Sequence, residues 1–268
     1  MYASFVHERR MLKVRLIKRL LLIILTGIFI YSGAHIVMYL YDGYKSNTLH
    51  ARLKQQYTIG LQAEHAAVPI GNETESKAQA MQQRGVDKFK SLLELNSDTV
   101  GWISIAGTKI DYPVVKYSDN DYYLNHDIER KRSLRGAIFM DYRNEDITKD
   151  AHTVIYGHHM KDGSMFGELS NYKNEAYYNE RDIIEFDGLE QSTTWKIFSV
   201  YTYTPQHQFF QFEFNNEQEY SEYLQKIIAE SSYDTGVNVS TQDQILTLVT
   251  CTYEVSDARF IVHAKRID

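Results

Sequence analysis

The chain has 268 residues, and 43% of them are hydrophobic, which is enough to bury the core of one β-rich domain. The net charge of −6 is unevenly distributed. Residues 1–19 hold six basic side chains and one acidic one, so the rest of the chain holds 23 basic and 34 acidic residues, a charge of −11. An acidic body repels a phosphate backbone, which argues against a nucleic-acid partner.

An uncharged apolar stretch occupies residues 20–40. A helix of this length, rising about 1.5 Å per residue, spans the hydrocarbon layer of about 30 Å. Basic residues are retained on the cytoplasmic face. We therefore predict a cytoplasmic tail over 1–19, a single-pass transmembrane anchor over 20–40 and an extracellular body. A cleaved signal peptide is the alternative, but the apolar run continues to Leu40, beyond the usual length of a signal-peptide core.

A polar, weakly patterned segment follows over residues 41–86, which we interpret as an extracellular spacer between membrane and domain. Phe89, Leu92 and Leu93 then have the i, i+3, i+4 spacing of a short amphipathic helix. This helix is expected to begin the folded domain, which we assign to residues 87–268.

Strand-like patterns dominate that domain, and they are interrupted by one long helical pattern. The helix is predicted over Asn216 to Glu230, where Asn216 and Glu219 form an N-terminal capping pattern. Many short strands with few helices favour a closed β-barrel. We predict a mostly β fold, a closed eight-stranded barrel with an N-terminal helix and a long helix between the sixth and seventh strands. The predicted strands cover residues 100–105, 110–115, 136–140, 153–156, 183–186, 194–203, 245–251 and 260–264.

The only cysteine, Cys251, ends one apolar run, and Arg259 begins the next. Outside the cell a single cysteine cannot form an intramolecular disulfide. Antiparallel pairing would place it opposite Arg259, whose permanent charge can favour a thiolate and hold an oxyanion. An inert buried thiol is the alternative for the cysteine. Arg259 can equally pair with Asp257 or Glu254, and spacing alone does not decide between these readings.

A thiol catalyst also needs a proton donor for its leaving group, usually histidine. Among ten histidines, His158 and His159 are the best placed, because they follow a predicted strand that ends at Gly157. A zinc site of His152, His158 and His159 is the weaker reading, since the sequence has no HExxH or paired-cysteine spacing. The histidines expected on the surface or in packing are His126, His152, His207 and His263.

Taken together, these motifs resemble those of the sortase family. Residues 247–251 (TLVTC) are similar to its TLxTC signature, and Arg259 fits its C-x7-R spacing. Residues 156–166 (YGHHMKDGSMF) resemble the histidine loop of class B sortases, as residues 119–124 (DNDYYL) and 139–144 (FMDYRN) resemble other parts of that class. The resemblance covers roughly residues 88–268.

The resemblance implies a cysteine transpeptidase on the outer face of a Gram-positive cell membrane. Cys251 would attack the threonine carbonyl of an NPxTx-type sorting signal and form a thioacyl intermediate. His158 would protonate the departing amine, and Arg259 would stabilise the oxyanion. The implied partners are surface proteins or pilins that carry the signal, and the acceptor is an amine of a cell-wall precursor or pilin. Neither a cofactor nor a metal is expected, because nothing matches the acidic calcium site of class A.

The resemblance also suggests substrate-binding positions. Two of these positions, Tyr223 and Ile227, lie on the predicted helix and are equally suited to core packing. The alternatives to a sortase are another extracellular Cys/His peptidoglycan hydrolase or transpeptidase, and a non-catalytic, membrane-tethered binding module. The candidate substrate-binding residues are Asn120, Leu124, Tyr223, Ile227, Val249 and Thr250.

Overall fold

The polypeptide forms one long N-terminal helix and a β-rich unit that packs around a closed sheet. The computed structural model describes residues 2–66, 88–203, 210–251 and 259–268. Two compact units are distinguished, Met1–Lys45 and Ser46–Asp268. Helix α1 (Tyr2–Ala66) contributes residues to both of them.

The first part of α1 carries the apolar stretch. Within the described residues, one helical segment, Ile17–Gln62, is long and apolar enough to cross a membrane. Large apolar side chains such as Leu22 and Phe29 are exposed there. Length and composition therefore make this segment a candidate membrane anchor or signal.

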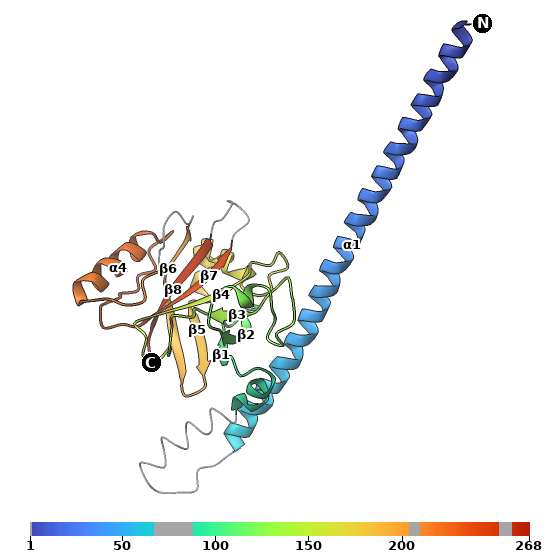
Figure 1. Ribbon diagram of the computed structural model, residues 1–268. Coiled ribbons are helices and arrows are strands. Elements are labelled where there is room, and N and C mark those ends of the chain that lie inside the picture. The colour runs from blue at the N-terminus through green and yellow to red at the C-terminus, as the bar shows by residue number, and fades with distance from the viewer. Residues whose placement is uncertain (1, 67–87, 204–209, 252–258) are drawn as a thin grey trace. The chain divides into compact units, whose positions relative to one another are not determined.

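Eight strands close into a barrel in the order β1-β2-β3-β4-β7-β8-β6-β5 (Figure 1). The β2–β3 and β4–β7 pairs are parallel, and the other pairs are antiparallel. The predicted closed eight-stranded barrel is confirmed. The strands are β1 (Thr99–Ser104), β2 (Asp111–Lys116), β3 (Ile138–Met140), β4 (His152–Gly157), β5 (Ile183–Gly188), β6 (Ser192–Tyr203), β7 (Ile245–Cys251) and β8 (Arg259–Arg266).

The central strands are buried on both faces, which explains why they read as continuous apolar runs. Leu246 and Leu248 of β7 belong to the cluster that fills the barrel, together with Val262 of β8. Ile245 instead belongs to a cluster beneath a helix on the outer face. Because strand side chains alternate between faces, such strands need apolar residues at nearly every position.

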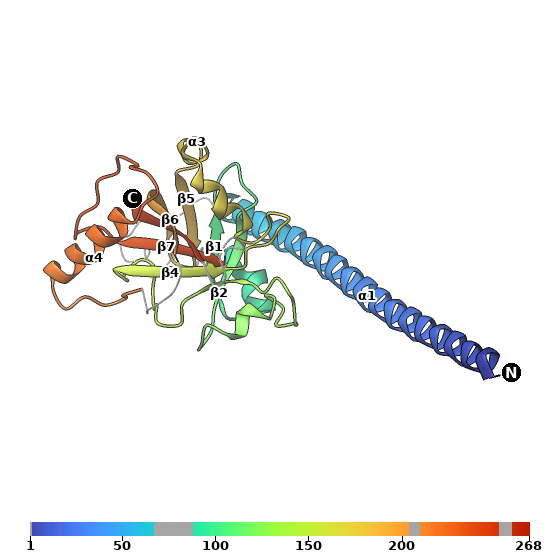
Figure 2. The same ribbon diagram turned by 90° about the horizontal axis from the view of Figure 1, so that it is seen from above.

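The predicted long helix is α4 (Glu217–Ala229), which lies between β6 and β7 in the chain. The Asn216 side chain accepts a hydrogen bond from the backbone N–H of Glu219 at 2.9 Å, so the predicted cap is present. Its buried face packs against Phe198 and Ile245. The shorter helical elements are residues 88–95, η1 (Tyr122–Leu124), η2 (Gly167–Lys173) and α3 (Glu175–Asn179). Figure 2 shows α3 and α4 on different sides of the barrel.

The expected spacer contains a helix that packs on the barrel. Leu53 of α1 is buried, and the Tyr57 ring stacks on Trp102 with centroids 4.4 Å apart. The His50 ring contacts the backbone oxygen of Asp111 at 2.6 Å. Residues 46–66 thus belong to the β-rich unit. Their weak apolar pattern did not predict this packing.

Two fully buried histidines join four strands on the outer face of the barrel. His152 Nδ1 donates to the carbonyl of Gln211 at 2.7 Å, and its Nε2 accepts from the Thr247 hydroxyl at 2.7 Å. Thr247 in turn accepts from His263 Nδ1 at 2.6 Å, and His263 Nε2 accepts from the Tyr201 hydroxyl at 2.9 Å. Each ring therefore carries one proton, on Nδ1. Both histidines were predicted to lie on the surface or in packing, and the structure places both in packing.

These histidines make stability depend on pH. Burial lowers the pKa of His152 to about 4 and holds that of His263 well below its usual value. The unfolded chain binds protons below about pH 6.5 while the native protein does not, so the free energy of unfolding falls as pH drops from 6.5 toward 4. For His152 alone the loss is about 3 kcal/mol. We expect His152→Gln to flatten this fall in urea-unfolding curves of the full chain. Equal slopes for variant and wild type would contradict it.

Candidate active site

The three candidate catalytic residues lie at the same end of three neighbouring strands. In the parallel β4–β7 pair, Gly157 lies opposite Thr250, so His158 follows at the level of Cys251. In the antiparallel β7–β8 pair, Cys251 lies opposite Arg259, as the sequence predicted. The sheet therefore places a thiol, an imidazole and a guanidinium residue side by side.

Part of this site falls outside the described residues. Of Cys251 only the backbone is described, and residues 252–258 are not, so the alternative partners Asp257 and Glu254 lie outside the description. His207 also lies outside the described residues. Arg259 itself is partly buried.

His158 is oriented by a backbone group. Its Nε2 lies 2.7 Å from the carbonyl oxygen of Leu124, at the end of η1. A carbonyl only accepts, so Nε2 carries a proton, and the state of the ring is decided at Nδ1. Leu124 was predicted as a substrate-pocket residue. Its contact with the candidate proton carrier was missed, because a main-chain oxygen leaves no trace in the residue type.

The histidine loop needs a glycine at its start. A Cβ on Gly157 would lie 2.5 Å from Ile138 Cδ1 and 2.8 Å from the Phe166 ring, closer than real Cβ contacts come. The loop closes when Phe166 donates its backbone N–H to the His158 carbonyl at 3.0 Å. The position of His158 thus depends on close packing directly beneath it.

Asn120 lies in a polar cluster centred on Asp141. Its amide donates to Asp141 at 2.9 Å, and its oxygen accepts from the backbone of Tyr142 at 3.0 Å. Asp141 is fully buried. Burial alone would raise the pKa of Asp141, but hydrogen bonds from Arg143, Tyr156 and Asn120 outweigh it and lower that pKa. The two class B-like motifs at 119–124 and 139–144 therefore form one hydrogen-bonded unit.

Four other predicted substrate-binding residues are buried. Tyr223 and Ile227 lie on the buried face of α4. The Tyr223 ring is 5.5 Å from that of His152, at the start of β4 and about 20 Å of strand away from His158. The structure therefore does not bring Tyr223 and Ile227 to the strand end beside His158. Val249 and Thr250 adjoin Cys251 in β7 and are 2% and 1% exposed.

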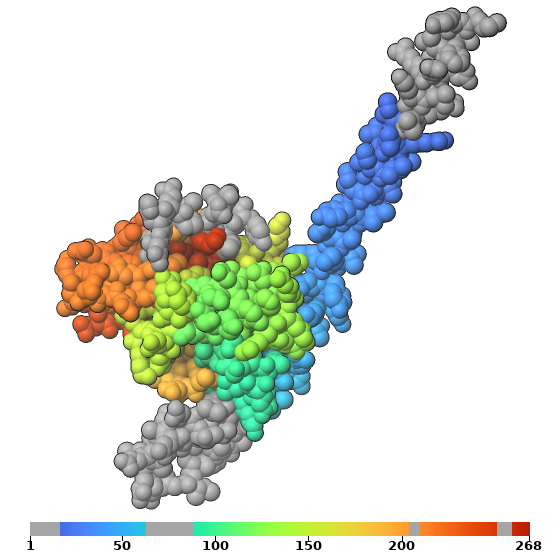
Figure 3. Space-filling view, in the orientation of Figure 1, coloured from blue at the N-terminus to red at the C-terminus, as the bar shows by residue number. Residues whose placement is uncertain are grey.

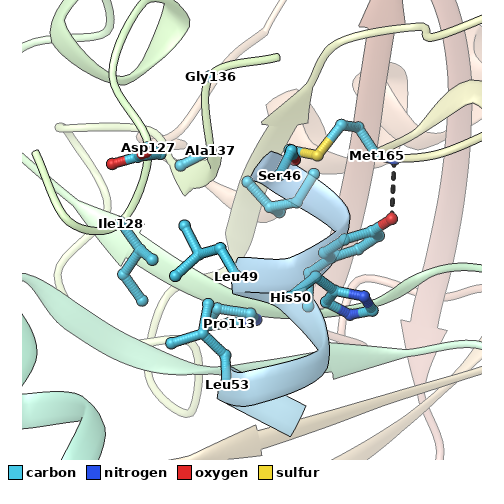
Figure 4. Close-up of a pocket in the computed structure, with 12 residues that line it drawn as sticks. Ser46, Leu49, His50, Leu53, Pro113, Asp127, Ile128, Gly136, Ala137 and Met165 are labelled. Carbon is cyan, nitrogen blue, oxygen red and sulfur yellow. Dashed lines mark hydrogen bonds between the residues drawn. The ribbon is translucent and has the colours of Figure 1, made fainter. Parts of the chain in front are cut away.

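Neither the zinc reading nor a nearby cavity changes this picture. Both ring nitrogens of His152 already serve protein groups. Within the described ranges no group of three or more His, Cys, Asp or Glu residues is arranged to hold a metal ion. A hollow of about 40 Å³ lies between α1 and strands β2 and β3. Figure 4 shows Leu49 and Leu53 of α1 facing Ile128 there. None of the candidate site residues lines it.

Comparisons with known proteins point to a single family. Residues 103–267 match the family model described as the Sortase domain. Sortase B of Listeria monocytogenes is 34% identical over 252 residues, 93% of this chain and 96% of the relative. Sortase B of Staphylococcus aureus is 38% identical over 182 residues, 67% of this chain and 75% of the relative. A solved Staphylococcus aureus sortase B–substrate complex superposes with a TM-score of 0.73 at 32% identity, covering 85% of this chain and 98% of that one.

The packing under the histidine loop gives a stability prediction. Gly157→Ala should lower the free energy of unfolding of the full chain by about 1–3 kcal/mol, because the added methyl overpacks the site. Ile138→Val removes the nearest atom, so the double variant should lose less than the sum of the two single losses. Urea unfolding of all four proteins measures this coupling. Strictly additive losses would show that the clash is not with Ile138.

Proposed function

Since this chain belongs to the sortase family, in its class B branch, and is a cysteine transpeptidase, we propose that Cys251, His158 and Arg259 carry its chemistry. Enzymes of this family act on substrate proteins that bear sorting signals and transfer them to amine acceptors. The observation that carries the assignment is the register of β4, β7 and β8, which brings the three residues to one strand end.

The proposed reaction has two steps. The Cys251 thiolate attacks the carbonyl carbon of threonine in an NPxTx-type signal, and the following peptide bond breaks as His158 protonates the leaving amine. A thioester between threonine and Cys251 remains. The acceptor amine then gives a proton to His158 and attacks the thioester, which forms a new amide bond and releases the thiolate.

Arg259 supplies the electrostatic part of this mechanism. Its positively charged guanidinium, beside Cys251, favours the thiolate and then the oxyanion of each tetrahedral intermediate. The Leu124 carbonyl accepts from Nε2 of His158 and orients the ring, and we assign the proton exchange to the other ring nitrogen, Nδ1. These roles of Cys251, His158 and Arg259 require neither a metal nor a cofactor.

The proposed partners follow from the same assignment. The substrates are surface proteins or pilins with an NPxTx-type signal, and the acceptor is an amine of a cell-wall precursor or pilin. Asn120 and Leu124, beside the strand end, are the proposed contacts of the signal. We place the catalytic domain outside the membrane, with residues 20–40 as the anchor and the basic residues 1–19 on the cytoplasmic side. Family membership argues against a non-catalytic binding module.

Substitution of the three residues tests the catalytic assignment. Cys251→Ala should abolish cleavage of a fluorogenic NPxTx peptide by the full chain in detergent. His158→Ala and Arg259→Ala should each lower kcat/KM by about 10³-fold or more, because each removes a group that acts in the transition state. His159→Ala is the matched control and should cost much less. Near-normal turnover of the His158 variant would sink the assignment.

The covalent step can be observed directly. Rapid acid quenching during turnover should give a protein whose mass is increased by the peptide portion ending in threonine, and fragmentation should locate it on Cys251. An added amine should discharge this adduct, since a thioester is open to aminolysis. A protein that turns over peptide without any adduct on Cys251 would refute the thioacyl route.

A further inference from the structure

A buried ion pair at the end of β3 reaches across the outer face of β4. The guanidinium of Arg143 donates from Nε and from Nη2 to the two carboxylate oxygens of Asp141, each at 2.8 Å. Asp141 is fully buried, whereas the Arg143 side chain remains 28% exposed. Two parallel bonds fix the plane and direction of the guanidinium more tightly than one contact would.

The same carboxylate fastens two other parts of the site. It accepts from the Asn120 amide, in the turn that ends in η1, and from the Tyr156 hydroxyl at 2.9 Å. Tyr156 lies two residues before His158 in β4, on the strand face opposite to that of Ile155, which points into the barrel core. Asp141 thus ties the 119–124 turn to the strand that leads to His158.

The free face of the Arg143 guanidinium covers an aromatic ring from a distant segment. Its central carbon lies 3.9 Å from the ring centroid of Phe212, just ahead of α4. Phe212 also stacks on His152 with centroids 5.7 Å apart and an interplanar angle of 17°. In Figure 3 the orange surface of this region borders the yellow-green surface of residues near 145.

Residues 210–212 therefore lie along β4, where several side-chain contacts fix them. Gln211 accepts the hydrogen bond from buried His152, and the Phe210 ring approaches Tyr156 edge-on at 6.4 Å. The turn that contains Asn120 bonds the same carboxylate of Asp141 that accepts from Tyr156. Arg143 links this turn to residues 210–212, because it contacts both Asp141 and Phe212, and the Phe210–Tyr156 ring contact is a second link.

We propose that Arg143 is a positioning residue for substrate selection. It holds residues 210–212 at a fixed distance from the 119–124 turn and so sets the width of the path by which the sorting peptide reaches Cys251. This rests on the proposed function. Arginine is suited to the role because its planar fork matches the carboxylate while its face stacks on the ring, which lysine cannot do together.

The test compares full-length Arg143→Gln, Arg143→Lys and wild-type protein in detergent. Lys196→Gln is the matched control, because it removes another ion-paired cation, bound to Asp182 on the β5 side of the barrel. The measurements are kcat and KM for the NPxTx peptide, the iodoacetamide alkylation rate of Cys251, and hydrogen exchange of residues 210–216.

For Arg143→Gln we expect KM to rise about tenfold or more, while kcat stays within about threefold and the alkylation rate is unchanged. Exchange in 210–216 should become about tenfold faster. Arg143→Lys should behave like Arg143→Gln in KM, and Lys196→Gln like wild type. An unchanged KM or unchanged exchange overturns the proposal, as does an altered alkylation rate, which would mean that Arg143 acts on the thiol.

The measurements distinguish failure of the proposed function from failure of the positioning role of Arg143. If wild-type protein does not cleave the peptide, the substrate assignment fails, and the exchange of 210–216 alone decides whether Arg143 fastens that segment. Unchanged exchange in both variants would then refute the positioning role as well.

Discussion

The parallel pairing of β4 with β7 is the constraint on which the site depends. These strands are distant in sequence, and only their register brings His158 to the level of Cys251. A slip of one residue would turn every side chain of β4 to the opposite face. The His152–Thr247–His263 chain spans β4, β7 and β8 near the other end of the pairing and disfavours such a slip. Buried polar groups that find partners in one register alone specify that register.

The outer face of the barrel is where its polar chemistry is concentrated. Inside, the barrel is filled mainly with apolar side chains. Outside, one hydrogen-bonded chain runs through the two histidines, and a second unit surrounds Asp141. Both reach residues 210–212, one through Gln211 and the other through Phe212. An apolar interior supplies much of the stability, whereas the two outer networks fix loops whose own sequences have little tendency to order.

The strands and the long helix could be predicted because their signals are local. Runs such as 245–251 are apolar throughout, and Asn216 caps a helix with regular apolar spacing. The pairing of Cys251 with Arg259 followed from two neighbouring runs. The Leu124 carbonyl that orients His158 has no side-chain signal, and Arg143 meets Phe212 only after the chain has folded. Residues 46–66 present only a narrow apolar stripe, which resembles a polar spacer until its partner surface is known.

Closing the barrel through β7 and β8 has a consequence for the order of events in folding. Strand β7 inserts between β4 and β8, and β8 also pairs with β6, so the sheet stays open until residues 245–266 join it. Contacts between segments so far apart in sequence carry a high loop-closure cost and form late. Cys251, the proposed nucleophile, ends β7 and so joins the sheet with this closing segment. By this order His158 is in place before Cys251, so the proposed catalytic pair is complete only when the barrel has closed.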